Sequence, residues 1–527
     1  MKVILAINAG SSSVKISVYS AEFQQKPRQF AETQISGLTA PPAQLSYTRN
    51  GVTVRKSEKL QEEQVKSQDD AFKLLLKTLI EDQELKEIQA KDDIGITSHR
   101  IVHGGDYTAS QIITPDTYHH LEKLSDLAPL HNGAALTIVR SCIDELPDAV
   151  NVACFDSQFH STIPEHIRTY PINVDVAKKN HLRKYGFHGI SYSFITRSVA
   201  DFLKKDAADL NIIALHLGSG ASACAVRQGQ SWDTSMGLTP LAGLPGATRS
   251  GSVDPSLVFH YASDVGKLSP SSTSELHISR AEEILNKESG WKALTGDLAP
   301  LHNGAALTIV RSCIDELPDA VNVACFDSQF HSTIPEHIRT YPINIDVAKK
   351  NHLRKYGFHG ISYSFITSLV FHYASDVGKL SPSSTSELHI SRAEEILNKE
   401  SGWKALTGTT DFGVIADSDD PRHKLAFDIF VDRVCGFIGS YFVSLGGQVD
   451  ALVFAGGIGE KSGKLRARVG AQVACLGFEV DDSLNGKKIV DTVQDVGKQG
   501  NGKRVLVCQT DEQLEMARFC AENEKIW

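Results

Sequence analysis

Short apolar runs, glycine-rich turns and amphipathic stretches follow one another along this chain. The pattern predicts strands at Lys2–Ile7, which is almost wholly apolar, and at Val14–Tyr19, where apolar and polar residues alternate. Further apolar strands are predicted at Asn211–Leu217, Val449–Phe454 and Arg504–Gln509. Because strand, glycine-rich turn and helix recur in both halves, the pattern indicates an α/β architecture with ligand loops at strand ends.

Three helices are predicted from apolar spacing and end signals. Asp70–Ile80 places four apolar side chains on one face. Leu425–Leu445 predicts a long helix, and the following Gly446-Gly447 pair predicts where it ends. Thr510 with Gln513 predicts a capping box for the final helix.

The chain contains an internal duplication. Residues 126–196, block A, recur at 297–367 with Val174 against Ile345 as the difference. Residues 256–296, block B, recur unchanged at 368–408. Removing 112 residues, either 297–408 or 256–367, leaves the same 415-residue sequence because the two B copies are identical. The sequence therefore leaves open which B copy belongs to the core.

Size, charge and cysteine content bound the function classes. With 527 residues, 41% of them hydrophobic, the chain should form at least two domains. A net charge of −9 argues against a nucleic-acid partner, which needs a concentrated positive face. Nine scattered cysteines without a CxxC pair are typical of a reducing compartment. With no signal segment and no apolar stretch of membrane length, we expect a cytoplasmic protein without a membrane partner.

Three glycine- and serine-rich turns follow apolar strands. Their sequences are NAGSSS at 8–13, HLGSGAS at 216–222 and AGGIGE at 455–460. Backbone N–H groups in such turns can surround phosphate oxygens, and hydroxyl groups add donors. A single turn of this kind is more often only a tight turn, but three at strand ends favour nucleotide binding. The GxxxxGK[ST] pattern of a P-loop is absent.

Four residues suit phosphoryl transfer by their chemistry. Arg100 in HRIVHGG and Arg249 in TRSG offer the planar fork that binds carboxylate or phosphate, and a transferring phosphoryl group needs such cations. Asp156 follows an apolar strand in FDSQFH, and His188 lies in YGFHG. Taken singly, each has an ordinary structural explanation: a solvated arginine, a turn aspartate or a core histidine.

The whole set resembles the acetate and propionate kinases, a branch of the actin-like ATPase superfamily. The resemblance runs from Met1 nearly to the C-terminus once 112 residues are set aside. Ten strings in the same order carry it: INAGSSSVK, HRIVHGG, APLHN, FDSQFH, YGFHG, HLGSGAS, DTSMGLTPLAGL, TRSG, GGIGE and TDE. The resemblance implies ATP-dependent, reversible phosphorylation of acetate to acetyl phosphate by direct in-line transfer, with Mg²⁺ and in a homodimer.

The resemblance also implies a fold of two actin-like, or ribonuclease H-like, α/β domains with a cleft between them. The first domain is expected at 1–157 together with the C-terminal helix 514–527. The second is expected at 158–296 and 409–513. We expect 297–408 to lie outside the core, and the first A block to serve the active site because it is continuous with 1–125 and 197–255.

The resemblance assigns roles to residues that match the family strings. It implies catalytic roles for Asp156, His188, Arg249 and Arg100, with Asp156 as acid/base or orienting carboxylate. It implies Mg²⁺ ligands at Asn8 and Glu512. The acetate site would comprise Arg100, Val102, Leu130, His131, Phe187 and Pro240. The nucleotide site would comprise Ser13, Lys15, His216, Leu217, Gly218, Ser219, Gly220, Asp411, Phe412, Gly413, Gly457, Ile458, Gly459, Glu460 and Lys461.

The chain departs from the family pattern at six positions. The family usually has Asn at Ser219, His at Tyr192, Asp at Ser252, Arg at Gly413, Asn at Lys461 and Pro at Gly133. Several of these lie on the nucleotide side. The resemblance therefore specifies the reaction type more closely than the phosphoryl donor.

Alternative functions stay open at this stage. Propionate is an alternative acceptor, because one methylene contributes only about 1–3 kcal/mol to discrimination. The second A block repeats part of the site as Asp327, His359, His302 and Phe358, but no second INAGSSS, HRIVHGG or TRSG accompanies it. An inactive product of a duplicated or misassembled coding sequence is a further alternative, as is another sugar-kinase-like or chaperone-like ATPase of the superfamily.

Overall fold

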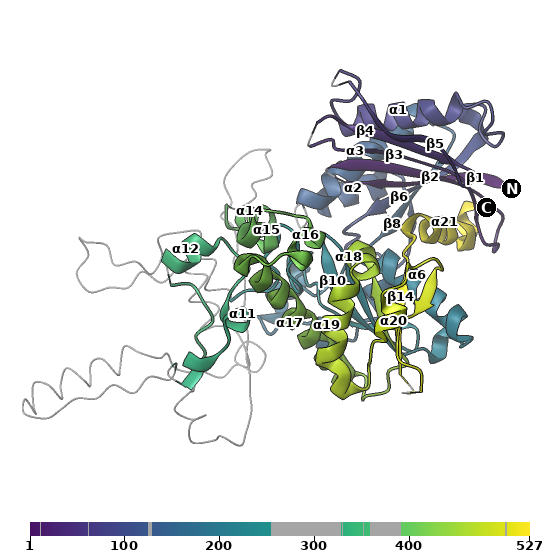
Figure 1. The fold of residues 1–527 in the computed structure, drawn as a ribbon. Coiled ribbons are helices and arrows are strands. Elements are labelled where there is room, and N and C mark those ends of the chain that lie inside the picture. Colours follow the sequence, from purple (N-terminus) through teal and green to yellow (C-terminus); the bar gives the residue numbers. More distant parts are fainter. Residues whose placement is uncertain are drawn as a thin grey trace, which may run out of the picture.

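Two β-sheets form the framework of the protein (Figure 1). The structure is a computed structural model that describes residues 1–10, 12–39, 41–61, 63–124, 129–254, 328, 330–350, 352–358, 392–500 and 503–527. Side chains at 129–131, 330, 350 and 392–395 are not among those described. The predicted α/β class is confirmed by two sheets with helices on their faces.

The first sheet orders eight described strands as β5-β4-β3-β2-β1-β6-β8-β7. They are β1 (Lys2–Ala9), β2 (Ser13–Ala21), β3 (Arg28–Ser36), β4 (Gln44–Arg49), β5 (Val52–Lys59), β6 (Ile94–Ile101), β7 (Gln111–Ile112) and β8 (Val150–Phe155). Strands β1 to β5 form an antiparallel run, whereas β1, β6 and β8 are parallel. The carboxyl ends of these three parallel strands therefore meet at one edge.

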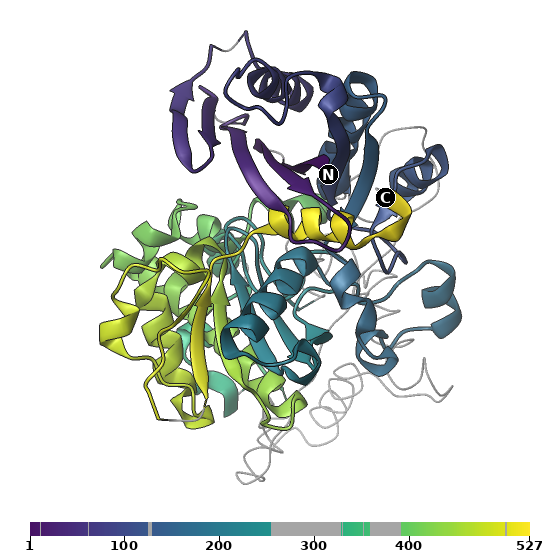
Figure 2. The same ribbon diagram turned by 90° about the vertical axis from the view of Figure 1, so that its right-hand side faces the viewer.

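Helices cover both faces of this sheet. On one face, α1 (Gln68–Ile80) and α3 (Pro129–Glu145) contribute to a single buried cluster with the strands. Helix α1 begins at Ser67, whose side chain accepts a hydrogen bond from the Asp70 amide, and its predicted apolar face is buried. On the other face, α21 (Glu512–Glu522) packs against β1 through Met516 and neighbouring residues. Figure 2 shows α21, in yellow, between the first sheet and the second half of the molecule.

The second sheet orders six described strands as β11-β10-β9-β12-β14-β13. They are β9 (Ile212–Leu217), β10 (Ala221–Arg227), β11 (Gln230–Thr234), β12 (Ala451–Ala455), β13 (Val493–Asp495) and β14 (Arg504–Cys508). Strands β9, β12 and β14 are parallel, so their carboxyl ends also share one edge. Helices α17 (Pro421–Ser444) and α19 (Gly463–Val473) pack on one face, and α6 (Gly189–Leu203) packs on the other.

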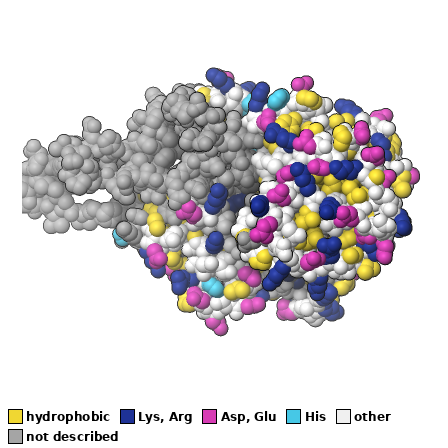
Figure 3. All heavy atoms as spheres, turned by 90° about the horizontal axis from the view of Figure 1, so that it is seen from above, with side chains coloured by type: hydrophobic (Ala, Val, Ile, Leu, Met, Phe, Trp, Pro, Cys, Tyr) yellow, Lys and Arg dark blue, Asp and Glu magenta, His cyan; other side chains and the backbone are white. Residues whose placement is uncertain are grey.

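The remaining helices and helical turns are short. They are η1 (Lys91–Asp93), α2 (Pro115–Leu124), η2 (Gln158–Thr162), α4 (Glu165–Arg168), α5 (Val174–Lys179), η3 (Ala207–Asp209), η4 (Phe330–Thr333), α11 (Glu336–Arg339), α12 (Ile345–Lys350), α14 (Arg392–Lys399), α15 (Gly402–Thr407), α16 (Phe412–Asp417), α18 (Gly456–Lys461), η5 (Ala474–Leu476), α20 (Asp482–Asn485) and η6 (Glu524–Ile526). Within the described ranges, no helix has the length and apolar character needed to cross a bilayer. Figure 3 shows acidic and basic side chains intermixed over the described part of one face.

The predicted capping box at Thr510 is wrong. Helix α21 begins at Glu512, and its cap is Asp511, whose side chain accepts from the Leu514 amide at 2.9 Å. The Thr510 hydroxyl instead donates to Glu460 Oε1 at 3.3 Å. Thr510 therefore lies in the turn between β14 and α21, where it contacts α18.

The end of the second B block lies in the core of the C-terminal half. Trp403 is 2% exposed, and its ring lies edge-on to those of Phe412 and Phe430. The Ser401 amide donates to the Thr248 carbonyl at 3.0 Å. We expected all of 297–408 to lie outside the core, and for 392–408 the structure differs. The physical reason is that the two B copies are identical, and the second continues directly into α16. The rest of the domain division stays a prediction.

The described part of the second A block packs differently from the first. Arg433 of α17 donates to the Ile338 carbonyl of α11 at 3.3 Å, and Ile343 is fully buried. In the first A block, Ile172, the counterpart of Ile343, is only half-buried, and the hydroxyl of the nearby Tyr170 accepts from the Leu238 amide at 2.9 Å. The same sequence therefore has two different sets of neighbours in this chain.

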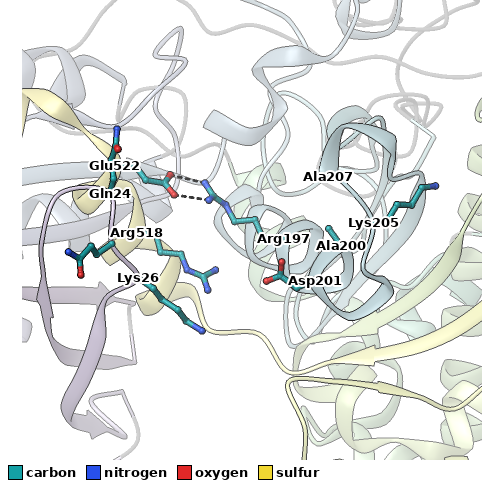
Figure 4. A pocket seen from close by; sticks show the side chains of 10 residues that line it. Gln24, Lys26, Arg197, Ala200, Asp201, Lys205, Ala207, Arg518 and Glu522 are labelled. Atoms are coloured by element: carbon teal, nitrogen blue, oxygen red, sulfur yellow. Dashed lines mark hydrogen bonds and ion pairs between the residues drawn. The ribbon is translucent and has the colours of Figure 1, made fainter.

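A buried carboxylate joins α21 to α6 at the junction of the two halves. Glu515 is fully buried and accepts from Ser193 at 2.6 Å, while Arg197 and Arg518 each approach it at 3.0 Å. Arg197 also forms a bidentate pair with Glu522 at 2.7 and 2.8 Å. Figure 4 shows this pair beside a cavity of about 320 Å³, which is lined by the turn between β2 and β3, by α6 with the segment after it, and by α21.

We expect Glu515→Gln to lower the free energy of unfolding by about 2 kcal/mol, because hydrogen bonds to a buried charge are lost while the shape is kept. Urea denaturation measures the change. Glu522→Gln is the matched control. The side chains of Glu522 and Arg197 are 45% and 40% exposed, so we expect Glu522→Gln to lower the free energy of unfolding by less than about 1 kcal/mol. Equal effects of the two substitutions would contradict a special role for the buried carboxylate.

Candidate active site

The carboxyl ends of β1, β6 and β8 bring polar side chains into one network. Arg100 on β6 donates through Nε and Nη2 to Asp156 Oδ1 and Oδ2 at 3.1 and 2.8 Å. Its Nη1 donates to Glu512 Oε2 at 2.7 Å. Asn8 Nδ2 donates to the same Glu512 oxygen at 3.2 Å, and Ser191 donates to the other at 2.5 Å. Residues far apart in sequence thus form one charged centre at the first turn of α21.

Burial and ion pairing set the charges of this centre. Burial raises the pKa of Asp156 above its ordinary value, and the ion pair with Arg100 opposes that shift. Burial also works to raise the pKa of Glu512, but Arg100, His216 and the Ser191 hydrogen bond hold it below its ordinary value. The pKa of Arg100 is raised, since Asp156 and Glu512 outweigh the opposing effect of burial. The centre is therefore a cation held between two carboxylates.

His188 and Arg249 approach this centre from the second sheet. His188 immediately precedes α6 and has a φ of +62°, a left-handed conformation that is uncommon for residues other than glycine. Its ring centroid lies 4.3 Å from that of His216 at the end of β9. A Cβ atom placed on Gly220 would lie 3.5 Å from Arg249 Nη1 and 3.6 Å from His188 Nε2. Both side chains therefore face the turn between β9 and β10.

The positive charge here belongs to the arginines rather than to His188. Burial holds the pKa of His188 well below its ordinary value, and His216, Arg100 and Arg249 lower it further. Burial, and then Arg100, lower the pKa of Arg249 as well. At neutral pH His188 is a neutral imidazole that can donate one N–H, while Arg100 and Arg249 supply cations.

An apolar cluster lies beside the charged centre. The predicted pocket residues Val102 and Phe187 belong to it, together with Tyr185, Met236 and Leu238. Sequence reasoning did not assign the last three, although they lie in the YGFHG and DTSMGLTPLAGL strings.

The remaining predicted pocket residues are Pro240, Leu130 and His131. Pro240 is buried outside the apolar cluster. The side chains of Leu130 and His131 lie outside the described residues. The prediction for these two positions therefore stays open.

Two of the predicted glycine-rich turns meet at the ends of β9 and β12. His216 pairs in register with Ala455, and the Gly218 amide donates to the Gly220 carbonyl at 3.1 Å. Gly456 has a φ of +74°, and a Cβ there would lie 2.8 Å from the Leu217 carbonyl oxygen. Only glycine therefore permits α18 to start this close to β9. The turn at 216–220 and the segment 457–461, which is helical, are brought side by side.

Several side chains predicted to bind the nucleotide have partners within the protein. Asp411 caps α16 by accepting from the Gly413 and Val414 amides. Phe412 is buried in the aromatic core. Glu460 Oε1 accepts from the Thr510 amide at 3.2 Å.

Other predicted nucleotide residues remain near the strand ends. Lys15 pairs in register with Asn8, and its Nζ lies 3.0 Å from Glu32. Ser13 begins β2, and its carbonyl accepts from the Gly10 amide at 2.9 Å. The side chain of Lys461 is exposed on α18. The nucleotide roles of these residues, and of Asp411, Phe412 and Glu460, stay predictions.

The second A block does not reproduce this site in the described residues. Asp327, His359 and His302 lie outside them. Phe358 is 68% exposed, whereas its counterpart Phe187 is 1% exposed. The local turn is nevertheless the same, because His331 Nε2 lies 2.9 Å from the Phe358 carbonyl, as His160 Nε2 lies 3.0 Å from that of Phe187.

A family model and two curated relatives all relate this chain to the same protein family. Residues 3–297, 295–379 and 381–518 match the model of the acetokinase family, and the repeated matches are consistent with the duplication. A protein from Chaetomium globosum described as a probable acetate kinase is 53% identical over 539 residues, covering 100% of this chain and 99% of that protein. A probable acetate kinase from Neurospora crassa is 51% identical, covering 100% and 95%.

Solved structures show the same fold. An acetate kinase from Porphyromonas gingivalis has a TM-score of 0.63 at 24% identity, covering 98% of each chain. A propionate kinase from Francisella tularensis has a TM-score of 0.64 at 26% identity, covering 98% of this chain and 99% of that one. These likenesses confirm the predicted fold of two actin-like domains. On the family match and the whole-length identity to these relatives, the chain belongs to the acetokinase family.

Proposed function

We propose that this chain is an acetate kinase that transfers the γ-phosphoryl group of ATP to acetate, reversibly, giving acetyl phosphate and ADP. One observation carries the proposal: Arg100, Asp156, His188 and Arg249 gather at facing strand ends beside an apolar cluster. Cations and an N–H donor suit the equatorial oxygens of the phosphoryl group, and the cluster suits a short alkyl group. Membership of the acetokinase family and the acetate kinase relatives support the acceptor.

The acceptor binds through charge and shape. The Arg100 fork faces two carboxylates in this structure, so a carboxylate substrate matches its geometry. Val102 and Phe187 hold the methyl group in the apolar cluster. Propionate remains the alternative acceptor, since one extra methylene changes binding by only about 1–3 kcal/mol.

The transfer step requires no proton removal. An acetate oxygen forms the new bond to the γ-phosphorus as the bond to the bridging oxygen of ADP breaks, and ADP leaves with that electron pair. Because acetate is already a carboxylate, Asp156 acts by orienting Arg100 rather than as a base. Arg249 and the His188 N–H meet the charge on the equatorial oxygens.

We propose that Asn8 and Glu512 hold Mg²⁺. Asn8 Nδ2 donates to Glu512 Oε2 at 3.2 Å where β1 ends and α21 starts. With the amide turned so that its oxygen faces the ion, one amide oxygen and one carboxylate would fit an ion that keeps several waters. Mg²⁺ held there would supply positive charge that neutralises the phosphate groups of the nucleotide. Among the described residues, no group of three or more acidic, histidine or cysteine side chains forms a preassembled metal site.

The family resemblance further supports a cytoplasmic homodimer.

The test is a hydroxamate assay for acetyl phosphate with acetate, ATP and Mg²⁺. We expect activity from the full chain and from the 415-residue form that lacks one A and one B copy. Propionate, and other nucleoside triphosphates, are run in parallel to establish acceptor and donor.

Three other outcomes are informative. Activity in the short form alone would show that the extra 112 residues inactivate this chain. No acetyl phosphate from either form would contradict the proposed reaction. A preference for another donor would direct attention to Ser219 and Gly413, where the chain departs from the family.

A further inference from the structure

A buried chain of hydroxyl groups stands behind His188. His188 Nδ1 lies 2.8 Å from Ser222 Oγ on β10. Ser222 Oγ lies 2.5 Å from the Tyr192 hydroxyl on α6. Both Ser222 and Tyr192 are fully buried, so neither hydrogen bond competes with bulk water.

The direction of these hydrogen bonds follows from the hydroxyl at the far end. A phenol hydroxyl is a stronger hydrogen-bond donor than an alkyl hydroxyl, and Ser222 Oγ is the acceptor within reach of the Tyr192 hydroxyl. The Tyr192 hydroxyl hydrogen is then directed to Ser222 Oγ, and the Ser222 hydrogen is directed to His188 Nδ1. Nδ1 is thereby an acceptor, and the imidazole proton resides on Nε2. Nε2 is the atom that faces Gly220, where Arg249 also lies.

We propose that Tyr192 and Ser222 are positioning residues that hold His188 as the Nε2–H tautomer, so that it presents an N–H donor to the transferring phosphoryl group. The proposal rests on the proposed function for its catalytic consequence. Neither residue touches the reacting atoms; both act through the imidazole of His188.

Three observations around His188 support this assignment. Burial keeps its imidazole neutral, and only a neutral imidazole has two tautomers to choose between. His160, whose Nδ1 lies 2.7 Å from Ser231 Oγ, donates through Nε2 to the Phe187 carbonyl and so orients the peptide before His188. Ser222 belongs to 197–255, which occurs once, so no second copy of this serine accompanies the second A block.

The experiment combines kinetics with the ¹⁵N spectrum of histidine-labelled full-length protein, in which His188→Gln identifies the His188 signals. We expect a protonated Nε2 and a bare Nδ1 in the wild type. Ser222→Ala and Tyr192→Phe should each lower kcat at least about tenfold, with the KM for acetate little changed, and should move the His188 signals toward a tautomer mixture. Ser222→Thr, which keeps the hydroxyl group, should retain both properties.

Two results would overturn the proposal. One is a wild-type His188 that carries its proton on Nδ1. The other is a loss of kcat in Ser222→Ala or Tyr192→Phe with unchanged His188 signals, which would indicate a packing role. Because the spectrum is recorded without turnover, a wild type that makes no acetyl phosphate would remove the proposed function and leave the tautomer result standing. If Ser222→Ala fails to fold, the kcat values and His188 signals of Tyr192→Phe and Ser222→Thr test the proposal.

Discussion

Asp156→Asn is expected to lower kcat for acetyl phosphate formation by about a thousandfold. The Asp156 carboxylate is 1% exposed and holds Arg100 through two hydrogen bonds, so the neutral amide removes the charge that orients the guanidinium. Removing one group that orients charge toward the transition state costs about 10²–10³ in rate, and the loss of an ion pair adds to this. The hydroxamate assay measures the change, and thermal unfolding checks that the variant folds.

The chain supplies its own control for this experiment. Asp327 lies in the second A block within the same FDSQFH string. We expect Asp327→Asn to leave kcat unchanged, because the Arg100 contacts in the structure are made by the first block. Loss of activity at Asp327 together with survival at Asp156 would instead place the second block in the active site.

Trp403→Ala is expected to lower the free energy of unfolding by about 3–5 kcal/mol, the range for removing a large aromatic side chain from a core. The ring is 2% exposed and lies 5.3 Å from Phe412 and 5.5 Å from Phe430 between centroids. Its Nε1 donates to the Thr410 carbonyl at 3.3 Å. Urea denaturation followed by circular dichroism measures the loss.

Trp291 is the counterpart of Trp403 in the first B block, with identical neighbours in sequence. Because Trp403 occupies the core position, we expect Trp291→Ala to change the unfolding free energy by less than about 0.5 kcal/mol. The reverse order of effects would show that the first copy occupies the core. If each single variant is nearly neutral and only the double variant is destabilised, the two copies replace one another, which contradicts a fixed place for 392–408.

Local pattern predicted five of the fourteen described strands and three of the helices, because these elements carry a signal among near neighbours. The strands at the chain start and after residue 210 were found within a few residues of their predicted bounds. Helix α17 begins at Pro421, four residues before the predicted start, because its first turn is polar and carries no apolar periodicity. The signal that could have located the start of α17 is Asp420 followed by Pro421. Aspartate is a common N-cap residue, and proline is common in the first turn of a helix.

The candidate site was predicted as a set of residues, but their pairing was not. Arg100 and Asp156 are 56 positions apart, and Arg100 and Glu512 are 412 apart, so no local pattern relates them. Tertiary structure joins them because parallel strands and α21 end at one edge. The Glu460 side chain lies in the GGIGE string yet has a turn partner, and Phe412 has core partners, which only the packing reveals.

The sequence by itself determined the α/β class, the glycine-rich turns and the residues with the chemistry for phosphoryl transfer. Tertiary structure alone decided how the repeated segments are used. Phe187 and Phe358 stand in the same local sequence and the same turn, yet they are 1% and 68% exposed. The two B blocks are identical, yet the described core contains Trp403 from the second. Burial and pairing depend on neighbours that distant parts of the chain supply, so two copies of one sequence reach different environments.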